Sequence, residues 1–156
     1  SRAAVDNLNA FLRNGGTILF DTRDKNGGAG MGVLRILARA LDIPPLAPIA
    51  PDHVLTRAYY LLGDFPGRWK GGKLWVERAG ERVNDGVSSI IVGGNDWAAA
   101  WATDANGVPL AAVVPEGRRQ RELAYRFGVN LVMYALTGNY KADQVHVPAL
   151  LERLGQ

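Results

Sequence analysis

The stretch GGTILFDTRDKNGGAGMGVLRILARALD, residues 15–42, decides the expected fold. It opens with apolar and β-branched residues between glycines and an aspartate, which predicts a short buried strand over residues 17–21. A polar, glycine-rich loop follows, and then Leu34, Leu37 and Leu41 recur at helical spacing. A strand, a loop and a helix in this order are typical of a doubly wound α/β sheet.

A second apolar run predicts another buried strand over residues 88–92. It also ends in a polar glycine loop, residues 93–96, and a short helix is expected to start at Trp97. A last long helix is expected over residues 118–136. Together these elements predict a three-layer α/β fold with a mainly parallel sheet, in which the strands 17–21 and 88–92 are central.

The chain opens directly on a predicted amphipathic helix. A helix that leads into a buried strand normally follows an earlier strand of the same sheet. We therefore expect residues 1–156 to form a single domain, the C-terminal part of a larger domain whose first strands precede Ser1. Such a domain would have a central strand with an unpaired edge, so we expect association into a homo-oligomer with residues 17–20 or 90–92 close to the join.

The composition argues against several classes of function. The formal net charge is only +3, and four arginines cluster in residues 118–126, a local patch that does not suggest nucleic-acid binding. The chain has no cysteine, which excludes disulfides, thiolate chemistry and cysteine-based zinc sites. No apolar run approaches the ~20 residues that span a bilayer, so this segment is not expected to cross a membrane.

The glycine-rich loop at residues 27–32 does not match known nucleotide-binding motifs. A dinucleotide fingerprint that starts at Gly28 needs glycine or alanine at position 33, where Val33 stands, and no GK[ST] phosphate loop occurs. The carboxylates of Asp21 and Asp24 would also repel a phosphate. We therefore expect no cofactor and interpret the loop as a segment whose glycines adopt unusual dihedral angles.

Polar side chains follow both predicted strands at the points where the strands end. If the strands are parallel neighbours, these side chains meet at one edge of the sheet, where α/β folds place their ligands. The proline-rich connector at residues 43–51 could bring the next two residues to the same edge. The candidate pocket therefore comprises Asp21, Arg23, Asp24, Asp52, His53, Asn95, Asp96 and Trp97.

Two interpretations of this pocket stay open. Aspartate and histidine can ligate a metal or perform acid–base chemistry. Aspartates that follow strands also cap helices and turns, a lone histidine is often a hydrogen-bonded structural residue, and Trp97 is typical of core packing. Catalysis requires His53 and at least two carboxylates to converge within hydrogen-bond or ligand reach.

Four segments also carry a resemblance to a known family. They are NGGTILFDTRD (14–24), DHVLTRAYYLL (52–62), GGNDWAAAWA (93–102) and RQRELAYRFGVNLVMYALTGNYKADQVHVPALLERLG (119–155). On these segments the chain resembles domain-of-unknown-function family 4159, in particular its alphaproteobacterial members. The resemblance implies a flavodoxin-like sheet similar to that of class I glutamine amidotransferase-like proteins. It also implies that the domain is the C-terminal part of a larger protein tethered to the inner membrane of the bacterial cell envelope, with an N-terminal region similar to aerotolerance regulators.

The resemblance carries little chemistry over to this chain. Active members of the wider amidotransferase-like superfamily use a cysteine nucleophile, which this chain lacks, and the family itself has no assigned catalytic residues. We therefore expect a non-catalytic ligand-sensing or protein-interaction domain, with other domains of the same full-length protein as partners. The alternative is a hydrolase or transferase with an Asp/His site, with or without a divalent metal.

Overall fold

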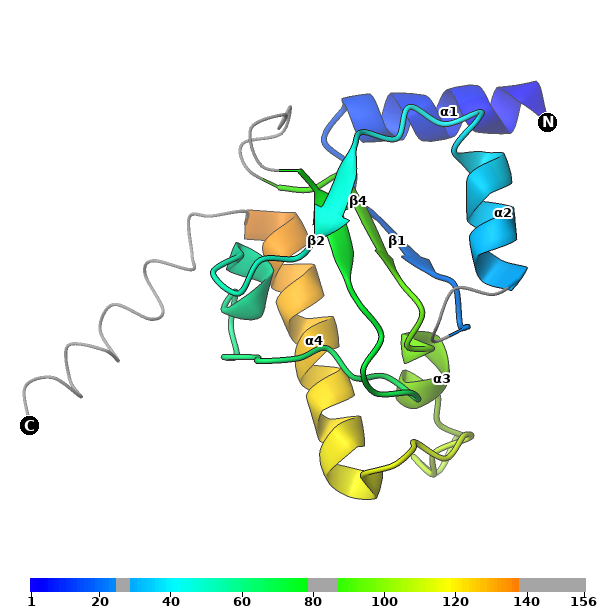
Figure 1. The fold of residues 1–156 in the computed structure, drawn as a ribbon. Coiled ribbons are helices and arrows are strands. Elements are labelled where there is room, and N and C mark those ends of the chain that lie inside the picture. Colours follow the sequence, from blue (N-terminus) through cyan, green and yellow to red (C-terminus); the bar gives the residue numbers. More distant parts are fainter. Residues whose placement is uncertain (25–28, 79–86, 138–156) are drawn as a thin grey trace, which may run out of the picture.

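The structure is a computed structural model that describes residues 1–24, 29–78 and 87–137. Helices and strands are interspersed along the chain, as expected of an α/β domain (Figure 1). In chain order the elements are α1 (Arg2–Arg13), β1 (Ile18–Asp21), α2 (Ala29–Leu37), β2 (Leu46–Pro48), the 3₁₀ helix η1 (Val54–Thr56), β3 (Trp75–Glu77), β4 (Ile90–Gly93), α3 (Trp97–Trp101) and α4 (Gly117–Thr137).

The described strands form one sheet in the order β1-β4-β3-β2. β1 and β4 are parallel neighbours, with Ile18 beside Ile90 and Asp21 beside Gly93, and this confirms the expected pairing. β3 runs antiparallel to β4, and β2 runs antiparallel to β3. The sheet is therefore mixed, and the prediction of a mainly parallel sheet is wrong.

Part of the difference lies in the proline-rich connector at residues 43–51, for which no strand is expected because proline lacks a backbone donor. Leu46–Pro48 instead forms the edge strand β2, with Ala47 opposite Val76. Proline is tolerated there because an edge strand needs only one of its two sides for hydrogen bonds. Short strands of this kind carry no strong alternation of apolar residues, so the sequence pattern does not reveal them.

The position of β1 also differs from the expectation. Within residues 1–24, 29–78 and 87–137, β1 lies at the edge of the sheet, whereas β4 lies inside it. All four residues of β4 are buried, but all four residues of β1 are only half-buried. The prediction that both strands are central is therefore correct for β4 and wrong for β1 in the described part of the chain.

Helices cover both faces of the sheet and create three layers (Figure 1). On one face, Phe20 and Val92 pack with Leu12 of α1 and Leu34 of α2. Asn9 of α1 bonds to the segment that follows α2: its side chain donates to the Ala40 carbonyl and accepts from the Asp42 amide. Because side chains alternate along a strand, the residues between these apolar positions point to the opposite face.

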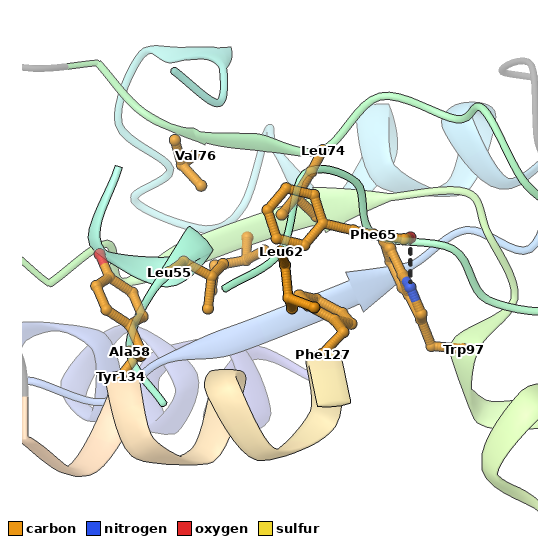
Figure 2. Packing of buried hydrophobic residues seen from close by; sticks show 10 residues of the cluster. Leu55, Ala58, Leu62, Phe65, Leu74, Val76, Trp97, Phe127 and Tyr134 are labelled. Carbon is orange, nitrogen blue, oxygen red and sulfur yellow. Dashed lines mark hydrogen bonds between the residues drawn. The ribbon is translucent and has the colours of Figure 1, made fainter. Parts of the chain in front are cut away.

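The opposite face holds the larger core, which α4 covers (Figure 2). Ile91 of β4 packs there with Leu55, Trp97, Phe127 and Tyr134, and none of these five side chains has measurable exposure to solvent. Their combined apolar area makes this cluster the main source of hydrophobic stabilisation. It also fixes the position of α3 against α4, and α3 follows directly after the loop at the carboxyl end of β4.

Candidate functional site

The carboxyl ends of β1 and β4 bring two polar loops into contact. The Asp21 carboxylate accepts a hydrogen bond from the Asp96 amide at 3.0 Å and another from the Ala98 amide at 3.1 Å. These N–H groups belong to the first turn of α3, where a helix leaves amides without an intrahelical partner. Asp96 occupies the N-cap position but makes no capping bond with its own side chain. Asp21 therefore caps α3 from the neighbouring strand.

The Asp96 side chain is turned toward two arginines instead. Its carboxylate is only 3% exposed and lies 3.2 Å from Arg23 Nε and 3.5 Å from Arg68 Nη1. Asp96 and Arg23 both adopt left-handed backbone conformations, with φ of 54° and 63°. Such values are uncommon for residues other than glycine, so the fold holds both residues in this geometry against a local backbone preference.

The environment of Asp21 raises the pKa of its carboxyl group. Burial raises the pKa of Asp21 above its ordinary value of 3.8, and the nearby Asp96 carboxylate raises it further. The backbone amides that donate to Asp21 act in the opposite direction and lower this pKa, with the Ala98 amide contributing most among them. The net effect is an upward shift, because desolvation is the largest contribution.

Asn95 and Trp97 hold a neighbouring loop in place. The Asn95 side chain donates to the Phe65 carbonyl at 2.8 Å and accepts from the Gly72 amide at 3.0 Å, and both Asn95 and Phe65 are buried. Trp97 Nε1 also donates to the Phe65 carbonyl, at 2.9 Å (Figure 2). A Cβ added at Gly67 would collide with the Asn95 carbonyl oxygen, so only glycine fits there. These side chains therefore attach the 65–72 loop to the carboxyl edge.

The remaining polar groups of the β1 loop also bond within the edge. The Thr22 amide donates to the Gly93 carbonyl at 2.8 Å and extends the pairing of β1 with β4 by one residue. The Thr22 hydroxyl lies 2.6 Å from the Asp24 carboxylate. Asp24 thus lies in the same loop as Asp21 and Arg23, as the sequence predicts.

His53 and Asp52 do not join this group. His53 Nδ1 accepts from the Leu55 amide at 3.2 Å, and its ring centroid lies 5.5 Å from that of Tyr134. The Tyr134 hydroxyl in turn accepts from the Ser88 amide, just before β4 begins. Ser88 and Gly93 are separated by about 16 Å, at ~3.3 Å per residue along an extended chain. The expectation that the histidine meets the carboxylates at one edge is therefore wrong.

The physical reason is the docking of the segment after β2 on α4. Leu55 and Ala58 are buried in the core, and Asn130 of α4 holds their backbone in place. The Asn130 side chain donates to the carbonyls of Leu55 and Tyr60 and accepts from the amides of Tyr59 and Tyr60. These contacts draw His53 toward the C-terminal end of α4 and away from the carboxyl edge of the sheet.

The sequence pattern also missed Arg68 as a member of the edge site. This residue lies in a loop without periodicity, and only the folded position of the 65–72 loop brings it to Asp96. Its guanidinium also lies 4.7 Å from the ring centroid of Trp69. A basic residue in a glycine-rich loop carries no sequence signal that distinguishes an ion pair from a solvated side chain.

The edge site is thus a set of charged groups whose hydrogen bonds and ion pairs lie within the fold. It contains the carboxylates of Asp21, Asp24 and Asp96 and the guanidinium groups of Arg23 and Arg68. In residues 1–24, 29–78 and 87–137, no three metal-binding side chains lie close enough together to hold a metal ion. Among these residues, His53 and the carboxylates of the edge do not converge on one site.

Fold and site together define a three-layer α/β domain with a mixed sheet and an internally bonded carboxyl edge. The family model for the domain of unknown function DUF4159 matches residues 1–136, so the chain belongs to that family. A search of curated proteins found none that matches this chain. Among the described helices, none has the length and apolar character that a membrane crossing requires.

Proposed function

We propose that this domain is a non-catalytic protein-interaction domain of an envelope-associated bacterial protein, and that it binds through the open edge of β1. The observation that carries the proposal is that β1 has the apolar residues typical of a strand inside a sheet but lies at the edge of the described sheet. An unpaired strand edge offers a row of N–H and C=O groups that another strand can bind.

The hydrogen bonds of β1 show which backbone groups are available. The Ile18 amide donates to the Ser89 carbonyl and the Thr22 amide to the Gly93 carbonyl, so alternate residues face β4. The amides of Leu19 and Asp21 therefore point away from β4. No strand lies beside them in the part of the chain that the structure describes.

The side chains of β1 support the same conclusion. Ile18 and Phe20 pack with one core cluster, and Leu19 packs with the cluster on the other face of the sheet. A strand that is apolar on both faces is typical of the interior of a sheet, where neighbours lie on both sides. The partner we propose is an extended segment supplied by another part of the same full-length protein.

The carboxyl edge favours binding over catalysis. Asp21 caps a helix, Asp96 is paired with two arginines, and Asn95 and Trp97 hold a loop. Each of these groups has a role in the stability of the fold. Ligand sensing, the other non-catalytic role expected from the sequence, has no comparable observation within the described residues.

The cellular location is part of the same proposal. Tethering to the inner membrane in the full-length protein, and kinship with class I glutamine amidotransferase-like folds, are supported by the resemblance of the four quoted segments alone. Membrane fractionation of the full-length protein tests the location. Recovery of the full-length protein in the soluble fraction would contradict it.

Amide hydrogen exchange tests the open edge while the partner segment is still unidentified. In the 156-residue chain at low concentration, the amides of Leu19 and Asp21 should exchange much faster than that of Thr22, which bonds to Gly93. In the full-length protein, the Leu19 and Asp21 amides should become protected, while Thr22 stays protected in both. Equal exchange of Leu19 in the two proteins, fast or slow, would refute the proposal.

A substitution adds an independent test. Leu19→Pro removes one outward N–H and leaves intact the amides of Ile18 and Thr22, which bond to Ser89 and Gly93. Proline is tolerated at strand edges of this kind. We expect the variant to fold, as judged by circular dichroism, and Asp21 to remain unprotected even in the full-length protein. Normal protection of Asp21 in a folded Leu19→Pro variant would contradict the proposed pairing.

A further inference from the structure

α4 carries a second apolar face that the core does not use. Its inward face contributes Phe127 and Tyr134 to the main core. The opposite face carries Tyr125, Val129, Val132 and Leu136, which are 41%, 40%, 56% and 78% exposed. Single exposed apolar residues are ordinary, but a continuous row of them usually marks an interface. We call these four residues the outer stripe of α4.

The spacing of the outer stripe indicates the shape of its partner. The intervals between successive members are four, three and four residues. This is the a/d spacing of coiled coils, in which each side chain inserts between residues of a facing helix with the same repeat. A second copy of α4 presents the same spacing by necessity, and a two-fold axis would make the contact self-complementary.

Charges decide the orientation of such a pair. The a/d row continues toward the N-terminus of α4 with Glu122 and Arg118. In a parallel pair, Arg118 would face Arg118 of the partner subunit and Glu122 would face the partner's Glu122, and both contacts are repulsive. In an antiparallel pair with Val129 opposite the partner's Val132, Tyr125 meets the partner's Leu136. The two charged residues then lie outside the apolar overlap.

We propose that the outer stripe forms an antiparallel helix pair with the same stripe of a second copy of this chain. The contact is independent of the β1 edge, which lies on a different element. The overlap from Tyr125 to Leu136 is about 17 Å long at ~1.5 Å per residue. Stable interfaces bury about 800 Å² per partner, and those below ~600 Å² per partner are typical of weak complexes. We expect a contact along one helix to be of the weak kind, so the dimer should be reversible and depend on protein concentration.

Sedimentation equilibrium of the 156-residue chain tests the association. Protein concentrations from about 10 µM to about 500 µM cover the range in which a weak complex forms. The average mass should rise from 16.8 kDa toward twice that value as the concentration increases. Val132→Glu should remain monomeric throughout. Ile36→Glu makes the same change at a residue of α2 that is 69% exposed, and it should associate like the wild type. A wild type that stays monomeric, or a Val132→Glu variant that still dimerises, overturns the proposal.

Disulfide cross-linking tests the orientation, because the chain has no cysteine of its own. An oxidised mixture of Tyr125→Cys and Leu136→Cys proteins should form the mixed dimer, since these positions face each other in the antiparallel pair. Tyr125→Cys alone should not cross-link, because its two copies would lie about 17 Å apart along the axis. Cross-linking of Tyr125→Cys with itself, or loss of dimerisation in Leu19→Pro, would assign the contact to a different geometry or surface and refute the inference.

Discussion

Replacement of Asp21 by alanine should destabilise the domain by removing the cap of α3. The substitution leaves the amides of Asp96 and Ala98 without their acceptor, at a position that is half-buried. Loss of an N-cap side chain costs about 1 kcal/mol, and the second amide adds a similar amount. Relief of the repulsion between Asp21 and Asp96 offsets part of this cost. We therefore expect a net loss of about 1.4 kcal/mol, equivalent to about tenfold in the unfolding constant.

Urea unfolding followed by circular dichroism measures this loss. With a slope near 2 kcal/mol per molar urea, the midpoint should fall by about 0.7 M with no change in slope. Asp42→Ala is the matched control, since the Asp42 carboxylate is exposed and pairs with the exposed Arg13 at 3.0 Å. That control should change stability by less than ~0.5 kcal/mol. An Asp21→Ala variant as stable as the wild type would show that Asp21 does not cap α3.

Three further outcomes follow from the same structure. Burial raises the pKa of Asp21, so the folded state holds this proton more tightly than the unfolded state does. The contribution of Asp21 to the free energy of unfolding should therefore fall as the pH rises above 3.8. Unfolding measured across this pH range should show a smaller fall for Asp21→Asn than for the wild type. Asn130→Ala removes a side chain that bonds four backbone groups and should cost about 3 kcal/mol in urea unfolding. The control Asn7→Ala changes an exposed residue and should cost less than ~0.5 kcal/mol. Similar midpoints for the two variants would contradict this prediction. Gly93→Ala would drive a Cβ into the buried indole of Trp97 and should cost about 1–3 kcal/mol of unfolding free energy. At Gly63 an added Cβ meets nothing within 4 Å, so Gly63→Ala should leave stability unchanged. Equal stability of the two variants would refute this packing.

The candidate site was predictable in the part that depends on local rules. Asp21 ends β1 and Asp96 follows β4, and the carboxyl ends of parallel neighbours meet, so their contact could be expected from the apolar runs alone. The placement of His53 could not. It depends on the docking of the segment after β2 on α4, through Asn130 and the buried Leu55, which lie far apart in the sequence. Arg68 carried no local signal at all.

The sequence by itself determined which segments are the main strands and helices. β4 and α4 were evident because burial of apolar side chains imposes a period on each element, and that period is a local property. Only the tertiary structure decided that the sheet is mixed, that β1 lies at its edge in the described part, and that the edge carboxylates bond to α3 and two arginines. The physical reason is that periodicity records whether a face is covered, whereas strand order, strand direction and the partners of polar atoms depend on contacts between residues that are distant in the sequence.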